Sequence, residues 1–180
     1  MMSLPRTTLV LGGARSGKSA YAEGLIRAAA PVATYLATAE AGDGEMADRI
    51  AHHRAARGAG WQTIEEPLDL VGTLRRVASP GRPVLVDCLT LWLSNLMHAG
   101  RDIAAETAGL ASCLADVVGP VVLVSNEVGQ GIVPDNALAR AFRDHAGRLH
   151  QAVASVVEQV VFVTAGLPMV LKSPEKHFVK

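Results

Sequence analysis

The sequence is poor in cysteine, in aromatic residues and in net charge, and each shortage excludes a class of protein. Its 180 residues include two cysteines, which by themselves cannot make a disulfide framework or a four-ligand zinc site. Aromatic residues make up 4%, which argues against the stacking surfaces that bind single-stranded nucleic acid. The 17 basic and 17 acidic residues cancel, so the broad positive field of a non-specific nucleic-acid binder is missing as well.

The sequence also lacks a long apolar run. A membrane-spanning helix needs about 20 mostly apolar residues, and the best candidates here are interrupted by polar residues such as Asp87 and Glu158. The N-terminus has no apolar core or cleavage site typical of a signal peptide. We therefore expect a cytoplasmic protein with reduced cysteines. Hydrophobic residues are abundant, at 49%, which predicts an ordered chain of one domain spanning residues 1–180.

Short β-branched runs alternate with longer stretches of helical period along the whole chain. Strands that are apolar on both faces and separated by helices predict a mostly parallel sheet covered on both sides, which is a three-layer α/β domain. The expected strands are residues 7–11, 32–37, 62–65, 84–86, 121–124 and 160–163. The expected helices are residues 18–29, 45–57, 68–78, 89–97, 102–117 and 134–158.

Residues 12–19 read GGARSGKS and match the phosphate-binding pattern G-x-x-x-x-G-K-[ST] in full. Glycines in such a loop let backbone N–H groups surround phosphate oxygens, and the following helix adds positive potential. Lys18 is expected to reach the β- and γ-phosphates, and the Ser19 hydroxyl to bind Mg²⁺. The predicted nucleotide-binding residues of the loop are Gly12, Gly13, Ala14, Arg15, Ser16, Gly17, Lys18 and Ser19.

Asp87 ends the apolar run of residues 84–86 and has two interpretations. An acid at the tip of a buried strand is the usual second Mg²⁺ contact beside a phosphate loop, often through water. The alternative is that Asp87 caps the helix expected to begin near Leu89. Because the phosphate loop is present, we favour the metal role.

Residues 45–57, EMADRIAHHRAAR, contain the adjacent histidines His52 and His53. Neutral histidine is a competent nucleophile toward phosphorus, and the arginines of this segment could bind triphosphate oxygens. On a helix the two imidazoles are about 100° apart, so only one of them can face a given ligand. The alternative, which residue types alone favour, is a solvated basic face with His53 packed on the core.

Three segments together resemble one enzyme family: GGARSGKS, EMADRIAHHRAARGAGW and SNEVGQGIVPDNALARAFRDHAGRLHQ. They are similar, in order and to about Leu171, to the bifunctional adenosylcobinamide kinase/adenosylcobinamide-phosphate guanylyltransferases of cobalamin biosynthesis. The resemblance implies a P-loop NTPase-like (RecA-like) fold. It also implies two reactions: phosphorylation of adenosylcobinamide by ATP or GTP, then transfer of GMP from GTP through a GMP-histidine intermediate.

The resemblance also assigns residues. It implies that His52 is the guanylylated nucleophile, beside Lys18 as the other catalytic residue, with Mg²⁺ as cofactor. It implies a homotrimer, which the apolar helix at residues 89–97 supports because a small domain does not readily bury so much. The implied guanine-nucleotide contacts outside the loop are Leu36, Ala37, Thr38, His53, Arg54, Ala55, Ala56, Glu65 and Asp87.

The corrinoid side of the site is less defined. The resemblance places it along the loop that begins at Ser125 and the helix that follows, with Arg140, Arg143, Asp144 and Arg148, although long helices also carry charge for solubility. The sequence departs from the family pattern at His150, where members often have Asn, and in the polar tail of residues 173–180.

Two other functions fit a phosphate loop. The first is a small-molecule kinase whose histidines are structural, which a stable GMP adduct would exclude. The second is a nucleotide-dependent regulatory switch, which would bind a partner protein in one nucleotide state and phosphorylate no small molecule.

Overall fold

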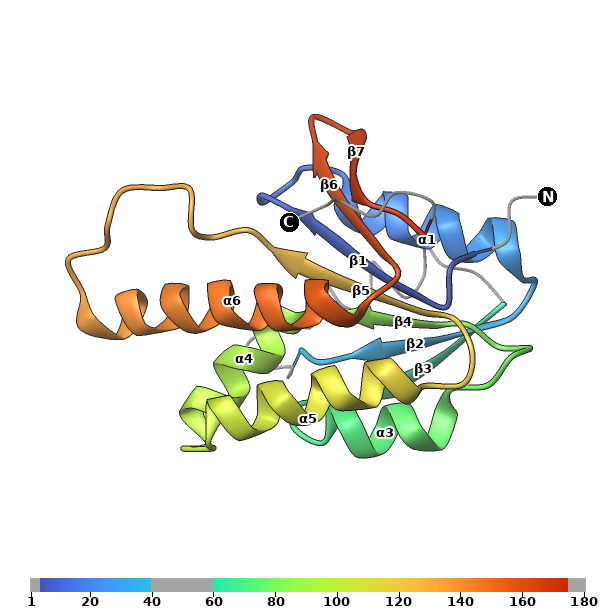
Figure 1. The fold of residues 1–180 in the computed structure, drawn as a ribbon, viewed down its shortest axis with the longest axis horizontal. Helices are drawn as coiled ribbons and strands as arrows, with labels where there is room; N and C mark the ends of the chain where they lie inside the picture. Colours follow the sequence, from blue (N-terminus) through green and yellow to red (C-terminus); the bar gives the residue numbers. More distant parts are fainter. Residues whose placement is uncertain (1–3, 40–59, 175–180) are drawn as a thin grey trace.

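The computed structural model describes residues 4–39 and 60–174 of the chain. These residues form one seven-stranded sheet with helices on both of its faces (Figure 1). The elements in chain order are β1 (Thr7–Gly12), α1 (Lys18–Ala29), β2 (Ala33–Ala37), β3 (Trp61–Glu65), α3 (Leu70–Val77), β4 (Val84–Asp87), α4 (Leu89–His98), α5 (Ile103–Asp116), β5 (Val121–Asn126), α6 (Ala137–Val156), β6 (Gln159–Thr164) and β7 (Leu167–Lys172).

The order of the strands fixes where the phosphate loop lies. The sheet runs β3-β2-β4-β5-β1-β6-β7, and β1 to β6 are all parallel. The carboxyl ends of these six strands therefore meet at one edge, where ligands of such sheets bind. β5 lies between β1, which leads into the phosphate loop, and β4, which ends at Asp87. The mostly parallel α/β sheet expected from the sequence is confirmed.

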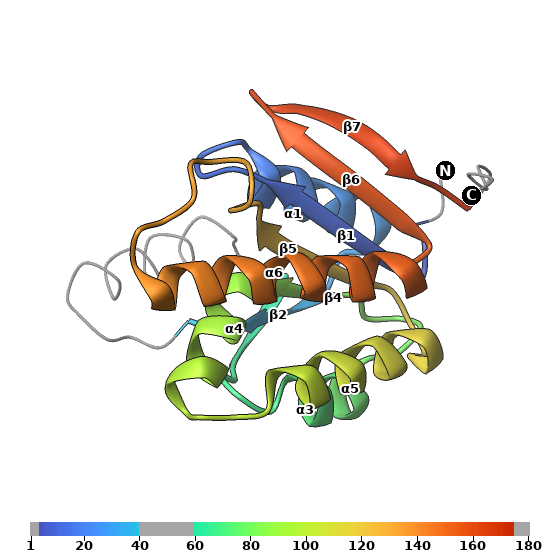
Figure 2. The same cartoon turned by 60° about the vertical axis from the view of Figure 1, so that its left-hand side comes forward.

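Two hydrophobic cores hold the layers together, one on each face of the sheet. α1 covers one face, where its Ala22 and Ile26 lie in the same core cluster as Val10 of β1. Helices α3 to α6 cover the other face, where Leu9 and Leu11 of the same strand point (Figures 1 and 2). Successive side chains of a strand alternate between faces, so a strand buried on both must be apolar throughout.

The last long helix begins later than expected. The sequence pattern predicts a start at residue 134, whereas α6 begins at Ala137. Asn136 is the reason, because its side-chain oxygen accepts hydrogen bonds from the N–H groups of Leu138 and Ala139 and so caps the helix. Pro134 therefore belongs to the connection from β5, which extends beyond the carboxyl end of the sheet (Figure 1).

The sequence pattern does not predict β7, which is the one antiparallel strand among the described residues. It pairs with β6 through a two-residue turn in which Ala165 and Gly166 both have positive φ angles, 50° and 77°. Such turns match the twist of a β-hairpin. Figure 2 shows β7 along the outer edge of the sheet. Its Leu167 and Met169 side chains are exposed by 69% and 55%.

The apolar side chains of α4 do not support an oligomer, contrary to the expectation from sequence. Leu89, Trp92, Leu93 and Leu96 are all buried in the core formed by the chain itself. The exposed apolar side chains of the described residues lie elsewhere, notably on β7 and on the connection before α6. No described helix is both long and apolar enough to span a membrane.

Candidate functional site

The phosphate loop joins β1 to α1 with a backbone that only glycine permits at two positions. Gly17 has a φ angle of 93°, and a Cβ on Gly12 would come within 2.4 Å of the Val163 carbonyl oxygen. Arg15 also has a positive φ angle, 55°. Turns of this kind aim successive N–H groups into one concavity that binds anions. The loop predicted from the sequence therefore has the shape that phosphate binding requires.

Two side chains of the loop are buried inside it. The Lys18 ammonium donates a hydrogen bond to the Gly13 carbonyl oxygen over 3.1 Å, which places the charge over the loop. The buried Ser16 hydroxyl has no hydrogen-bond partner among the described residues. A buried polar group without a partner costs about 1–3 kcal/mol. A phosphate oxygen bound in the loop would supply the partner that Ser16 lacks.

Asp87 ends β4, two strands away from β1, a lateral distance of about 10 Å at ordinary strand spacing. The Tyr35 hydroxyl donates a hydrogen bond of 2.7 Å to its Oδ2 atom. Cys88, and not Asp87, is the N-cap residue of α4, and no side chain caps that helix. The interpretation of Asp87 as a helix cap is therefore wrong.

The residues proposed for Mg²⁺ fit that ion. Ser19, in the first turn of α1, offers a hydroxyl, and Asp87 offers a carboxylate. Hard oxygen donors of this kind suit Mg²⁺, which is held by few protein groups together with substrate phosphates. No group of three or more His, Cys, Asp or Glu side chains among the described residues could hold a metal ion.

The segment Leu36, Ala37 and Thr38 ends β2 and is buried. The Thr38 hydroxyl donates to the Cys88 carbonyl oxygen over 2.7 Å and accepts from the Cys88 N–H over 2.9 Å. These bonds tie the end of β2 to the start of α4. In this structure Thr38 therefore orders the site, and its predicted contact with the nucleotide stays a prediction.

Glu65 lies far from the phosphate loop. It is exposed at the end of the edge strand β3, in the same row of the sheet as Ala37 and Asp87. Four strand spacings separate β3 from β1, which is about 19 Å. The structure thus brings Asp87 close to the loop and leaves Glu65 at the far edge.

The predicted nucleophile and four of the predicted nucleotide contacts lie outside the described residues. These are His52, His53, Arg54, Ala55 and Ala56.

A cavity of about 610 Å³ adjoins the loop, and we call it the phosphate cavity. The loop after β5 lines it, as expected from the sequence. Residues of α4 and α6 also line it, which the sequence pattern does not predict. For α4 the sequence does contain a signal, because this helix starts where β4 ends and so lies at the same edge of the sheet. The lining residues are Ala14, Arg15, Lys18, Thr90, Leu91, Ser94, Asn126, Glu127, Val128 and Phe142.

Three polar side chains, those of Ser125, His150 and Glu127, lie next to one another beside the phosphate cavity. Ser125 Oγ lies 2.7 Å from His150 Nε2, and His150 Nδ1 lies 3.8 Å from Glu127 Oε2. The Gly129 N–H donates to the other carboxylate oxygen of Glu127. Burial lowers the pKa of His150, and the charge of Glu127 opposes that shift. Glu127 therefore lines the cavity next to the buried pair of Ser125 and His150.

The charged residues of α6 have local partners. Arg140 donates hydrogen bonds to the carbonyl oxygens of Pro134 and Asp135 and so holds the connection that precedes the helix. Arg143 and Asp144 form an ion pair of 3.5 Å. Neither these residues nor Arg148 line the phosphate cavity. Their role on the corrinoid side stays a prediction.

Comparison with known families decides the assignment. The family model described as "Cobinamide kinase / cobinamide phosphate guanyltransferase" (CobU) matches residues 8–171. The chain belongs to the CobU family. This match covers the phosphate loop, the histidine pair and the segment that follows β5, which are the three segments that carry the resemblance in the sequence.

Two curated proteins show how similar the CobU-family relatives are. The chain is 54% identical over 166 residues to the "Bifunctional adenosylcobalamin biosynthesis protein CobP" of Pseudomonas aeruginosa, covering 91% of this chain and 96% of that protein. It is 40% identical over 179 residues to the "Bifunctional adenosylcobalamin biosynthesis protein CobU" of Escherichia coli, covering 91% and 98%. The expected family is confirmed.

Solved structures agree with the fold expected for a CobU-family chain. The flagellar accessory protein FlaH of Methanocaldococcus jannaschii has a TM-score of 0.52 and 11% identity, over 94% of this chain and 80% of that one. An ATPase of a bacterial type III secretion system has a TM-score of 0.54 and 11% identity, over 89% and 51%. At such identity the likeness shows the fold alone, and it confirms the RecA-like P-loop architecture.

Proposed function

We propose that this CobU-family chain, acting as one domain, phosphorylates adenosylcobinamide and then transfers GMP to the product. The observation that carries the proposal is the single family match over residues 8–171, which includes both the phosphate loop and the histidine pair. The curated relatives are named bifunctional, in accord with two activities on one chain.

In the first reaction, the hydroxyl of the aminopropanol arm attacks the γ-phosphorus of ATP or GTP. A new O–P bond forms, the bond to the nucleoside diphosphate breaks, and the hydroxyl loses its proton. The loop amides and Lys18 stabilise the phosphoryl group in transit. Glu127 is the one carboxylate among the described residues that line the phosphate cavity, and it receives the proton. Mg²⁺ bound by Ser19 and Asp87 would neutralise charge on the phosphate oxygens.

In the second reaction, His52 attacks the α-phosphorus of GTP. An N–P bond forms and pyrophosphate leaves, which gives GMP-histidine. A phosphate oxygen of adenosylcobinamide phosphate then attacks the same phosphorus, releases His52 and yields adenosylcobinamide-GDP. Covalent catalysis of this kind replaces one difficult transfer by two displacements.

Labelling with GTP tests the proposal. The protein with Mg²⁺ and α-labelled GTP should acquire label that is acid-labile, base-stable and located at His52. His52→Ala should abolish the label yet retain transfer from γ-labelled ATP to adenosylcobinamide. His53→Ala is the matched control and should keep the adduct, because its imidazole points about 100° away if the segment is helical.

Two results would contradict this assignment. Label that moves to His53 in the His52→Ala protein would show that the wrong histidine was chosen. An unmutated protein that phosphorylates adenosylcobinamide but never acquires label would be a small-molecule kinase without guanylyl transfer.

We also propose a cytoplasmic homotrimer. β7 supports an oligomer, since it is an edge strand whose Val170 and Leu171 side chains are exposed by 50% and 42%. An unpaired apolar edge is a surface for association. Sedimentation should give a trimer at micromolar concentration, and Val170→Lys should shift the equilibrium from trimer toward monomer. A monomer in the unmutated protein would contradict the proposal.

A further inference from the structure

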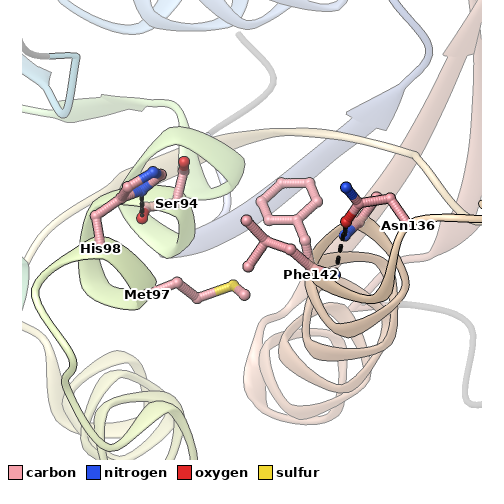
Figure 3. Close-up of a pocket in the computed structure, with 7 residues that line it drawn as sticks. Ser94, Met97, His98, Asn136 and Phe142 are labelled. Atoms are coloured by element: carbon pink, nitrogen blue, oxygen red, sulfur yellow. Dashed lines mark hydrogen bonds between the residues drawn. The ribbon is translucent and has the colours of Figure 1, made fainter.

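A second cavity, of about 630 Å³, lies between α4 and the start of α6. We call it the helix groove. Figure 3 shows Ser94, Met97 and His98 of α4 on one wall and Phe142 of α6 on the other. The residues that line the groove include Ser94, Met97, His98, Asn136, Leu138 and Phe142.

The helix groove is continuous with the phosphate cavity. Ser94 and Phe142 line both of them. A ligand seated in the groove can therefore extend past these two side chains to the phosphate loop. This continuity makes the groove part of the same site and gives its occupant access to the phosphoryl group.

Two of the polar side chains of the groove, His98 and Asn136, each use one atom to bind the backbone of their own helix. His98 Nδ1 donates to the Ser94 carbonyl oxygen over 2.7 Å. The side-chain oxygen of Asn136 caps α6. No Asp, Glu, Lys or Arg is present among the described residues that line the groove. A nucleobase is recognised through hydrogen bonds along its edges, and the groove offers few groups for that purpose.

The groove offers apolar surface instead. Leu138 is 61% exposed on its wall, and Met97, Ala139 and Phe142 are the other apolar lining residues. Exposed apolar side chains gathered near a cavity are typical of a binding surface. A cavity of this volume is within the usual range for small-molecule sites, about 300–1,000 Å³.

The geometry points to the helix groove as the site that binds one face of the corrin ring of the acceptor. The inference rests on the proposed function, which supplies a corrinoid substrate. Met97, Leu138 and Phe142 pack against the apolar face of the macrocycle. The aminopropanol arm passes Ser94 and Phe142 and places its hydroxyl in the phosphate cavity. The groove thus selects the macrocycle, while the loop selects the nucleotide.

Paired substitutions test the inference. Leu138→Asp puts a charge on the groove wall, and an acid in the first turn of α6 is favourable for the helix, so the fold should persist. Val118→Asp is the matched control, because Val118 is 64% exposed and precedes β5 at the opposite end of the strands. Leu138→Asp should raise the KM for adenosylcobinamide about tenfold or more. The KM for ATP and the labelling by GTP should stay unchanged, and Val118→Asp should change none of these.

Cobyric acid, which has the corrin ring but no aminopropanol arm, separates the ring from the reaction. It should compete with adenosylcobinamide, and direct titration should show that Leu138→Asp weakens its binding by a similar factor. An unchanged KM for adenosylcobinamide, or a raised KM for ATP alone, would overturn the inference. If the unmutated protein has no kinase activity, yet binds cobyric acid and loses that binding on Leu138→Asp, the proposed function is refuted. The assignment of the groove to the corrin ring would then still stand. If the unmutated protein neither reacts with nor binds a corrinoid, both are refuted.

Discussion

The phosphate cavity and the helix groove adjoin and have nearly the same volume, about 610 and 630 Å³, yet they are built in opposite ways. The phosphate-binding side of the first consists of backbone N–H groups and one lysine within eight consecutive residues, although α4 and α6 complete its wall. The second depends on side chains of α4 and α6, which lie some forty residues apart in the chain. Phosphate recognition is thus local in sequence, whereas the proposed acceptor site depends on the packing of distant helices.

Lys18→Ala should have the largest effect, because both transfers use the phosphate cavity. Loss of a charge-assisted contact in the transition state costs about 10²–10³ in rate. Kinase turnover and formation of the GMP adduct should both fall by that factor, while the thermal unfolding temperature stays close to that of the unmutated protein. Full kinase turnover in the folded variant would break the assignment of this cavity to the nucleotide.

Glu127→Gln should separate the two reactions that share the cavity. The amide keeps the shape of the side chain but cannot accept the hydroxyl proton, so kinase kcat should fall about 10²-fold. The adduct with GTP forms without any corrinoid hydroxyl, so labelling should persist. Equal loss of both activities in rapid-quench assays would show that Glu127 holds the nucleotide instead.

Asp87→Asn should have a smaller and more specific effect. If Asp87 helps to hold Mg²⁺, the metal concentration for half-maximal activity should rise about tenfold or more. Tyr35→Phe removes the hydrogen bond that orients the carboxylate and should shift the requirement in the same direction by less. If Asp87→Asn alters only thermal stability, the metal role is wrong.

His150→Asn should have the smallest effect, on stability rather than on rate. Burial lowers the pKa of His150 in the folded protein below its usual 6.5, so at acidic pH the unfolded chain binds the proton more tightly. The stabilising contribution is complete above about pH 6.5 and is lost as the pH falls toward the lowered pKa. Urea unfolding at several pH values should show a shallower pH slope in His150→Asn.

Much of the fold follows from the sequence because its strands are apolar on both faces. The start and end of α1, for instance, were predicted at Lys18 and Ala29, where the structure has them. The start of α6 was misplaced because the cap at Asn136 outweighs the helical pattern of the preceding residues. β7 was missed because its signal is a two-residue turn at Gly166 followed by a run that contains Pro168.

The candidate site shows the same contrast between features set by local sequence and features set by tertiary packing. The positions of the loop and of Asp87 at the carboxyl edge of the sheet could be predicted because each is contiguous with the strand that carries it. The wall formed by Ser94 and Phe142 could not, since nothing in the spacing of two helices tells which of their faces will enclose a cavity. Such a wall is a property of tertiary packing.

Binding of two ligands to two variants tests the division of the site most directly. The ligands are cobyric acid and a GTP analogue whose α–β and β–γ bridges cannot be cleaved, each titrated calorimetrically into the unmutated, Lys18→Ala and Leu138→Asp proteins. We expect each substitution to affect one ligand: Lys18→Ala should weaken binding of the nucleotide analogue only, and Leu138→Asp should weaken binding of cobyric acid only. If both substitutions weaken the same ligand and leave the other unaffected, the two cavities do not hold the two substrates.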